Sequence, residues 1–256
     1  MLILLPPSEG KTAAHTEKPV DLAELSFPEL TEARERVAQE LVKVSTGVDA
    51  LSVLKVGKTL SAEVERNQQI FAEPVAPASE IYSGVLFDAL DYASLTVAGK
   101  ENADRVILII SALWDAVGLT DEIPAYRLSM GVKLGHCGNL ATFWKGELSP
   151  ILVPWATHQL VIDCRSAAYA NAWKPAPEHT FAVRVEQVQP DGGRKAVSHF
   201  AKHYRGLLAR FIVENGLSHL NNIQDLVAAL NRQWEVELTL PRARKPGSLT
   251  LVVPAP

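Results

Sequence analysis

Three short apolar runs constrain the fold more than any other feature of the chain. Val106–Ser111 is rich in β-branched side chains, is apolar on both faces of a strand, and is flanked by polar residues. Leu160–Cys164 has the same character, and Leu2–Leu5 is closed by a pair of prolines. Such runs are typical of strands buried on both faces of a helix-covered sheet. We therefore predict a mixed α/β (α+β) fold, with a central mixed sheet flanked by helices.

The rest of the chain supplies outer strands and a helical region. Phe181–Val188 and Glu235–Leu240 alternate in polarity and predict more exposed strands, and Leu249–Val253 predicts a closing strand. A helical sub-region is predicted at about 27–72, with Pro28 at a helix start. Because 256 residues lie near the upper limit for one hydrophobic core, the chain forms either one large domain or two closely packed lobes. We expect the simpler arrangement, a single domain over residues 1–256.

Charge and composition narrow the class of protein. With 47% hydrophobic and 21% charged residues the chain is globular, and its net charge of −4 excludes a protein that is basic throughout. A polyanionic partner must therefore be held by a local cluster of lysine and arginine. Cys137 and Cys164 lie among apolar or small neighbours and are expected to be buried free thiols, as in a reducing compartment. The apolar run within Met1–Pro7 lacks a preceding basic region and is too short to span a membrane, so we expect a cytoplasmic protein with no membrane partner.

The most informative charged segment is a predicted helix over Ala196–Asn215. Helical spacing gives it an apolar core face and a basic face. The basic face comprises Lys195, His199, Lys202, His203, Gly206 and Arg210. A solvated surface is the simplest interpretation. Two features favour an anion-binding surface instead: no acidic residue follows until Glu214, so the charges repel one another, and Gly206 lowers helix stability by up to about 1 kcal/mol relative to alanine, a choice that suits close approach of a ligand.

The same face contains a histidine pair. His199 and His203 are spaced so that two imidazoles could share a metal ion. No HExxH glutamate and no obvious third ligand accompany them. We therefore favour contact with phosphate or nucleic acid over a metal site, and we predict neither a metal nor another cofactor.

A loop lysine follows the first predicted strand. Lys11 stands after a glycine, but Leu5 occupies the position where a P-loop requires its first glycine, so the Walker motif is excluded. Lys11 either lines a site at the carboxyl end of the strand or is an ordinary surface lysine.

Two helical stretches flank the turn Leu54–Gly57. This pattern suits a helix-hairpin-helix, in which Lys55, Gly57 and Lys58 would contact DNA phosphates. The usual hairpin has two glycines and this one has only Gly57, so an ordinary corner between helices is the simpler interpretation.

Polar residues also follow the predicted core strands. Tyr126 and Arg127 lie in an irregular segment, where the arginine could clamp a phosphate while the ring stacks on a base, or where the two side chains simply pack together. The residues that follow core strands are Asp163, Arg165, Ser166 and Tyr169 after one and Trp114 and Asp115 after another. Neighbouring strand ends form a common ligand site in α/β proteins, so these residues are candidates for one cleft.

Several short motifs form an ordered set that spans nearly the whole chain. They are Leu2–Leu4 with Lys11-Thr12, Tyr82–Gly84, Ser111 with Leu113, Tyr126–Leu128 with Met130-Gly131, Phe143-Trp144, Ser166 with Tyr169, and Phe200–Gly206 continuing to Arg210–Ile212. No one motif is diagnostic, whereas the ordered set is specific. It resembles the bacterial YaaA family, known as peroxide stress resistance proteins.

The resemblance implies a single α/β domain of unusual fold, with a helix-hairpin-helix-like element and a positively charged cleft that binds DNA and limits damage by peroxide and free iron. It implies no established catalytic mechanism. The cleft positions that it indicates are Lys11, Tyr82, Tyr126, Arg127, Lys202, Arg205 and Arg210. Ala168 stands where the family has a glutamate, Asp163 where asparagine is commoner, and Asp115 in place of a glycine. A catalytic carboxylate, if the protein uses one, would be Asp163 or Asp115.

Two functional hypotheses follow. The first is a DNA-binding protein of the peroxide stress response, whose basic residues hold the phosphate backbone without reading its sequence. The alternative is an enzyme that acts on a nucleotide, a nucleobase or damaged DNA in the same cleft. In it, Arg127, Lys202 and Arg205 grip phosphate, and Asp163 or Asp115 is the general base. We favour DNA binding.

Overall fold

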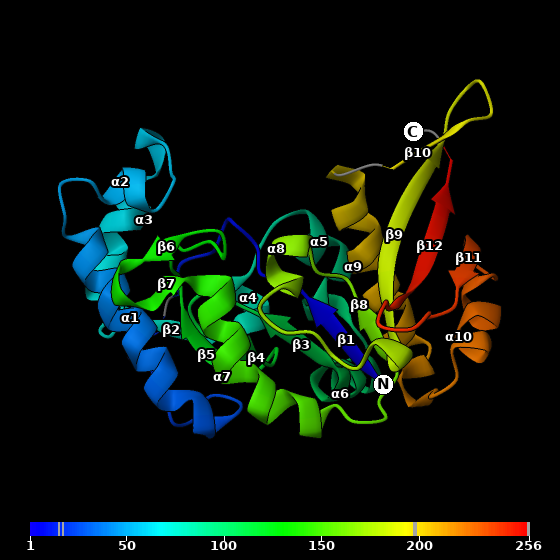
Figure 1. The fold of residues 1–256 in the computed structure, drawn as a ribbon, viewed down its shortest axis with the longest axis horizontal. Coiled ribbons are helices and arrows are strands. Elements are labelled where there is room, and N and C mark those ends of the chain that lie inside the picture. Colours follow the sequence, from blue (N-terminus) through cyan, green and yellow to red (C-terminus); the bar gives the residue numbers. More distant parts are fainter. Residues whose placement is uncertain (15, 17, 197–198, 255–256) are drawn as a thin grey trace.

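A mixed β-sheet runs through the centre of the computed structural model, which describes residues 1–14, 16, 18–196 and 199–254 but not the side chain of His199 (Figure 1). The strands are β1 (Leu2–Leu5), β2 (Val75–Pro77), β3 (Ile107–Ile110), β4 (Ala116–Val117), β5 (Glu122–Pro124), β6 (Lys133–Leu134), β7 (Gly138–Asn139), β8 (Val161–Asp163), β9 (Thr180–Val188), β10 (Arg194–Ala196), β11 (Glu235–Thr239) and β12 (Gly247–Val253). In the central sheet their order is β11-β12-β9-β8-β1-β3-β4, with β10 paired to β9. The small pairs β2–β5 and β6–β7 lie outside it.

The three predicted apolar runs form the centre of this sheet. Strand β1 lies between β3 and β8 and is parallel to both, with Ile3 opposite Ile107 on one side and Ile162 on the other. Every residue of β1, β3 and β8 is buried. Strands β8, β9 and β12 continue the parallel order, whereas β4, β10 and β11 are antiparallel to their neighbours. The predicted central mixed sheet is therefore confirmed.

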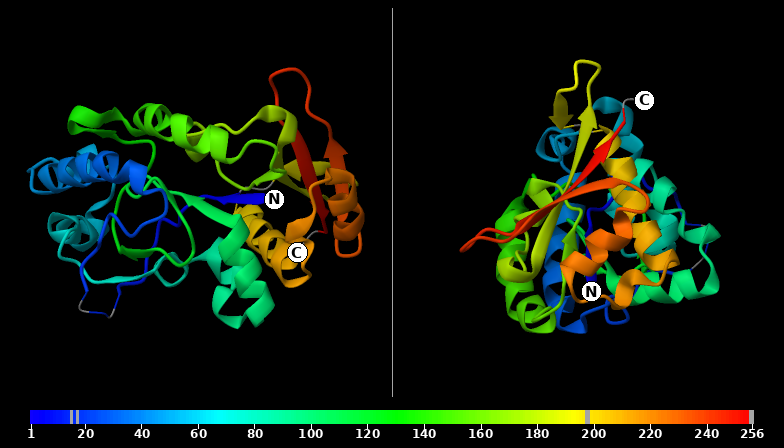
Figure 2. Two further views of the ribbon diagram at one scale, coloured as in Figure 1. Left: turned by 90° about the horizontal axis from the view of Figure 1, so that it is seen from below. Right: turned by 90° about the vertical axis from the view of Figure 1, so that its right-hand side faces the viewer.

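Helices cover both faces of the sheet. They are α1 (Thr31–Ser45), α2 (Ala50–Val53), α3 (Ser61–Arg66), α4 (Ala78–Ile81), α5 (Val85–Leu90), α6 (Val97–Val106), α7 (Leu140–Trp155), α8 (Ala167–Ala170), α9 (His199–Glu214) and α10 (Ile223–Leu230). Short 3₁₀ helices are η1 (Pro28–Leu30), η2 (Lys58–Leu60), η3 (Asn67–Gln69), η4 (Tyr92–Ser94), η5 (Gly135–Cys137), η6 (Pro177–His179) and η7 (Leu217–His219). Figure 2 shows α7 on one face and α5, α6 and α9 on the other.

The basic helix starts later than predicted. Lys195 belongs to β10, where it pairs with Gln187 of β9, and α9 begins at His199. The prediction of helix from Ala196 was wrong because the preceding residues extend the β9–β10 hairpin instead. Further along, the apolar face buries Leu208 and Ile212 as expected, whereas Phe200 is 46% exposed. Val197, which was also assigned to the helix, lies outside the described residues.

Two projections rise on the side of the molecule toward which the arrows of β1, β9 and β12 point (Figure 1). One contains α2 and α3, and the other contains the β9–β10 hairpin and the first turns of α9. The carboxyl end of β1 therefore faces the region between the projections, whereas β9 and β12 extend into one of them. Within the described part of the chain, no helix has both the length and the apolar character needed to cross a membrane.

Candidate functional site

A buried group of hydroxyls lies beyond the carboxyl end of β3. The Tyr126 hydroxyl is 2.7 Å from Ser111 Oγ and 3.1 Å from the Tyr82 hydroxyl, and all three side chains are buried. Ser111 Oγ also accepts hydrogen bonds from the backbone N–H groups of Leu113 and Trp114. Because a serine oxygen has two lone pairs, both are then occupied, and Ser111 must donate its own proton to Tyr126. In the hydrogen bond between Tyr126 and Tyr82 either hydroxyl can be the donor.

Lys11 brings an amine to this group from the loop after β1. Its backbone forms a bridge with Tyr82, and Thr12 N–H donates to the Ile81 carbonyl. The Lys11 Nζ donates to the Ser8 carbonyl at 2.8 Å and lies 4.0 Å from the centre of the Tyr126 ring. Burial is the main cause that lowers the pKa of this amine to about 7, with Glu9 and Glu63 acting in the opposite direction. Lys11 is therefore a mixture of amine and ammonium near neutral pH.

The lowered pKa predicts a pH-dependent contribution to stability. Between about pH 7 and 10 the unfolded chain binds a proton at Lys11 that the folded chain does not, so the free energy of unfolding is expected to rise with pH over this window. In Lys11→Met this contribution is removed. Urea unfolding at pH 6.5 and 9.5 should therefore show a smaller gain for the variant than for the wild type. An equal gain in both proteins would mean that burial does not lower the lysine pKa.

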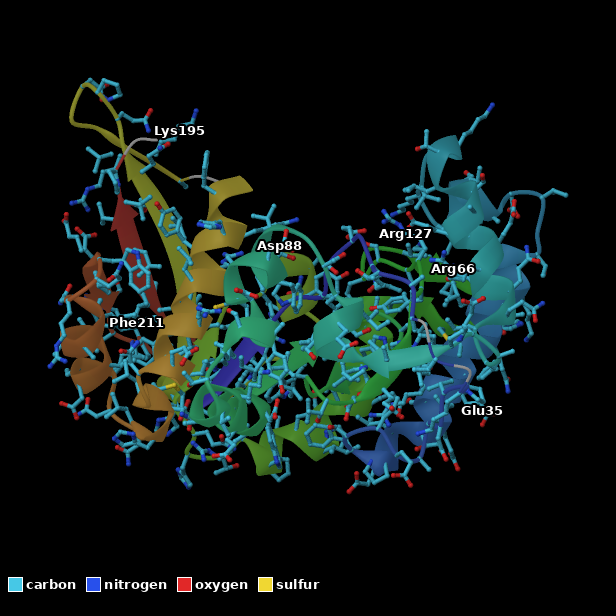
Figure 3. The ribbon with its side chains drawn as sticks, turned by 180° about the vertical axis from the view of Figure 1, so that it is seen from behind. Glu35, Arg66, Asp88, Arg127, Lys195 and Phe211 are labelled. Atoms are coloured by element: carbon cyan, nitrogen blue, oxygen red, sulfur yellow. The ribbon has the colours of Figure 1, made fainter. Side chains whose placement is uncertain are left out.

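Arg127 lies next to Lys11 and forms ion pairs with the nearby carboxylates. Its guanidinium contacts Glu9 Oε2 at 3.1 Å and Glu63 Oε2 at 3.6 Å, and it also donates to the Glu9 carbonyl. The Arg127 backbone is fixed by the fully buried Asn67 through hydrogen bonds of 2.8 and 2.9 Å. Figure 3 places Arg127 between the two projections. The position suits a site, and the guanidinium already has carboxylate partners, so its use as a phosphate clamp stays a prediction.

Residues after β8 complete this end of the sheet. Tyr169 is buried, and burial raises the pKa of its hydroxyl far above the usual range, while hydrogen bonds from Met130 and Ser129 act in the opposite direction. Ser166, by contrast, is exposed at the start of α8. Asp163 accepts from Nε and Nη2 of Arg165, both at 2.8 Å. Its two oxygens are thus engaged in orienting an arginine.

Asp115, the other predicted general base, is enclosed by an ion pair with Arg34, and its charge is, after burial, one of the causes that raise the pKa of Tyr82. Both it and Arg34 are fully buried, and Arg34 contacts both carboxylate oxygens, with Nη2 at 3.0 Å from Oδ1. Burial raises the pKa of Asp115 to about 7, and Arg34 acts against this rise. A carboxylate enclosed in this way serves the packing of α1 against the end of β3.

The sequence as a whole matches one family. The model of the peroxide stress protein YaaA matches residues 1–235. A UPF0246 protein of Streptomyces coelicolor is 42% identical over 256 residues, which cover 99% of this chain and 98% of the relative. A UPF0246 protein of Corynebacterium glutamicum is 40% identical over 99% of this chain and 100% of its own. The chain belongs to the YaaA family.

In this YaaA family member, the basic side chains of α9 do not form one continuous exposed surface. Lys202 is exposed and lines a pocket of about 170 Å³ together with Ser8–Gly10. Arg205 turns to the sheet and donates to the Val183 carbonyl. Arg210 donates to the carbonyls of Leu90 and Asp91 at the end of α5, and it also lies near the carboxylates of Asp91 and Glu214.

The surroundings of Gly206 contradict our prediction that a ligand approaches this residue. It is buried, and an added Cβ would overlap the Leu86 carbonyl oxygen and lie 2.8 Å from the Ala89 Cβ. The prediction that a ligand approaches this glycine was wrong. Helix α5 occupies the space, so Gly206 permits the close packing of α9 on α5.

The turn between α2 and η2 presents the other predicted lysines. Lys55 has a left-handed backbone (φ 58°) and donates from Nζ to the Gly131 carbonyl at 2.8 Å, while Lys58 is exposed at the start of η2. Gly57 is extended, with φ −75°. A corner between two short helices is therefore present in this projection of the YaaA fold, and the helix-hairpin-helix and its use in DNA binding remain predictions.

Several residues of the site in this YaaA family member were not predicted from the sequence. Ser8 and Glu9 are adjacent to Lys11, and the loop position was the only available signal. Glu63 and Asn67 meet Arg127 from 60 or more residues away, a pairing that no local pattern reveals. Among the described residues, no group of three or more His, Cys, Asp or Glu side chains could hold a metal ion. His199, one of the two histidines considered as metal ligands, has a side chain that lies outside the described part of the structure.

The two cysteines are free thiols. Cys164 is buried, as predicted, whereas Cys137 is half-buried.

Proposed function

We propose that this protein of the peroxide stress family binds DNA through the phosphate backbone, using lysines on both projections. The observation that carries the proposal is the exposure of Lys58 on one projection and of Lys195 and Lys202 on the other. None of the three forms an ion pair with another described residue. Exposed lysines without carboxylate partners are free to replace the counterions of a polyanion.

The same residues support binding that does not depend on base sequence. Lysine is a mobile point charge that suits phosphate oxygens and lacks the planar fork with which arginine reads guanine. The arginines of the site are already paired, with Arg127 held by Glu9 and Glu63. A protein with a net charge of −4 would also be repelled by DNA except where such lysines gather. The proposal therefore predicts weak dependence on sequence and strong dependence on salt.

Loss of one lysine from each projection tests this function. We expect Lys58→Ala with Lys202→Ala to weaken binding to a duplex oligonucleotide and to reduce the slope of log affinity against log salt by roughly two, because each phosphate contact contributes about 0.9. Fluorescence anisotropy between 50 and 200 mM salt measures both quantities. Lys18→Ala is the matched control, since it removes the same charge from an exposed lysine that is paired with Glu122 at 2.5 Å. Salt-independent wild-type binding, or equal slopes for all variants, would contradict the proposal.

A second candidate function is an enzyme that acts on a nucleotide, a nucleobase or damaged DNA. The observation that favours it is the Lys11 amine, with its pKa near 7, against the buried chain Ser111–Tyr126–Tyr82. Groups with such perturbed pKa values gather at functional sites. Turnover of nucleotides and damaged oligonucleotides by wild type, with at least a tenfold loss in Tyr126→Phe, is the expected result. Absence of turnover in the wild type, or full activity in a folded Tyr126→Phe, contradicts this function.

A further inference from the structure

We propose that the Lys11 amine is a nucleophile that forms an imine with an aldehyde, a reaction class that rests on the second candidate function. The contacts of the amine are neutral: the Ser8 carbonyl at 2.8 Å and the faces of the Tyr126 and Tyr82 rings at 4.0 and 5.5 Å. The carboxylates that would otherwise hold it as an ammonium group are instead paired with Arg127. Lysines that form imines in proteins are activated by such removal from water.

A pocket borders the loop that contacts the amine. Lys11 is not one of its lining residues, so imine formation requires the amine to leave the Ser8 carbonyl and turn into the pocket. Ser8–Gly10 form one wall of the 170 Å³ pocket, and Phe87, which stacks on Tyr82 with ring centroids 5.3 Å apart, forms another. Lys202 lines the same pocket and supplies a positive charge for a phosphate on the ligand. The ligand class is therefore a short aldehyde that carries a phosphate, either as a free sugar phosphate or as the opened deoxyribose of an abasic site in DNA.

The hydroxyl chain provides the protons that imine formation requires. The lone pair of the neutral amine attacks the aldehyde carbon, a C–N bond forms, and the carbonyl electron pair moves to oxygen, which takes a proton from the Tyr82 end of the chain. The nitrogen then returns a proton to the chain. Next the hydroxyl takes a proton from the chain, the C–O bond breaks as water leaves, and a C=N bond forms. The nitrogen then gives its remaining proton back to the chain. Tyr126 and Ser111 replace the proton of Tyr82 in turn, and no oxidant or reductant takes part.

Reductive trapping tests the inference on the wild-type protein. Glyceraldehyde 3-phosphate and sodium cyanoborohydride convert an imine into a stable secondary amine, and peptide mass spectrometry locates it. We expect labelling of Lys11 at pH 7 to be at least tenfold faster than labelling of the exposed Lys58. The Lys11 rate should rise between pH 6 and 8 and then level, because its pKa is near 7, whereas the rate of an ordinary lysine continues to rise toward pH 10. Labelling at Lys11 no faster than at Lys58, or a rate still rising at pH 10, overturns the inference.

Variants and a second probe separate the possible ligands. Lys11→Arg has a permanent charge and forms no imine, so the fast label should disappear, with circular dichroism as the check on folding. Lys202→Ala is expected to slow labelling by glyceraldehyde 3-phosphate at least fivefold and to leave labelling by unphosphorylated glyceraldehyde unchanged. Equal slowing with both aldehydes contradicts the role of Lys202. A duplex with one abasic site, used in place of the small aldehyde, gives a protein–DNA adduct if the DNA sugar is a ligand, and labelling by the small aldehyde alone assigns the site to free sugar phosphates.

The result for imine formation can be separated from the results for the two proposed functions. Turnover of a nucleotide or damaged DNA without any trapped adduct overturns the imine and leaves the second function standing. Failure of both turnover and trapping overturns both. DNA affinity is read separately, from the salt dependence of the Lys58 and Lys202 variants.

Discussion

Replacement of Asp115 by asparagine is expected to lower the free energy of unfolding by about 3–5 kcal/mol, the effect typical of breaking one side of a buried ion pair. The Arg34 side chain is fully buried and keeps its charge at any accessible pH. It would keep the backbone carbonyls of Leu22 and Ser26 and one amide oxygen as acceptors, but it would have no countercharge. Asparagine is the suitable replacement because Asp115 has φ 51°, a left-handed conformation that asparagine adopts readily. Urea unfolding at pH 8.5, above the raised pKa of Asp115 and therefore with the carboxyl ionised, measures the loss.

The paired variant is the control for this prediction. Arg34→Met together with Asp115→Asn removes the unpaired charge, so the double variant should be less destabilised than the sum of the two single changes. This pattern also separates a structural role from catalysis. If Asp115 were a general base, Asp115→Asn would abolish turnover in a protein of nearly normal stability. A loss of less than 1 kcal/mol would show that the pair contributes little to the fold.

Gly206→Ala is expected to lower the free energy of unfolding by about 1–3 kcal/mol, although alanine is the better helix former. The intrinsic preference of a helix for alanine over glycine is about 1 kcal/mol. At this position the new methyl group would overlap the Leu86 carbonyl oxygen, and backbone cannot move aside as a flexible side chain does. Forced separation of α9 from α5 outweighs the helical gain, as in other overpacked cores. Thermal and urea unfolding both report the change.

Gly146 offers a matched control in another helix. It lies within α7, and an added Cβ would have no atom within 4 Å. Gly146→Ala should therefore raise stability by up to about 1 kcal/mol, the intrinsic difference between the two residues. Stabilisation of both variants would mean that α5 does not crowd Gly206, and our earlier interpretation of a ligand at this glycine would return.

The centre of the fold was predictable because its signal is local. Unbroken apolar runs such as Val106–Ser111 indicate strands buried on both faces, and the sheet has them at its centre. The later start of α9 was not predictable from helical spacing, because a residue such as Lys195 suits a helix and a hairpin strand equally. The tertiary pairing of β10 with β9 decided between them.

The residues of the site could be predicted from the sequence, but the partners that they contact could not. Lys11, Tyr82, Tyr126 and Arg127 do lie together, at the strand ends where the sequence pattern places ligands. What each side chain contacts depends on segments far away in the chain. Arg210 looked unpaired because its acceptors, the carbonyls of Leu90 and Asp91, are 120 and 119 residues distant. Sequence spacing along one helix carries no information about such partners.

The placement of β1 has a consequence for how the molecule assembles. This strand is made before either neighbour, yet it pairs only with residues 107–109 and 161–163. Until those segments leave the ribosome, its unpaired edges and apolar side chains have no native partner, and closing such long loops is slow. We infer that the central sheet forms late, after the local helical segments, and that the nascent chain depends on protection of its first strand for most of its synthesis.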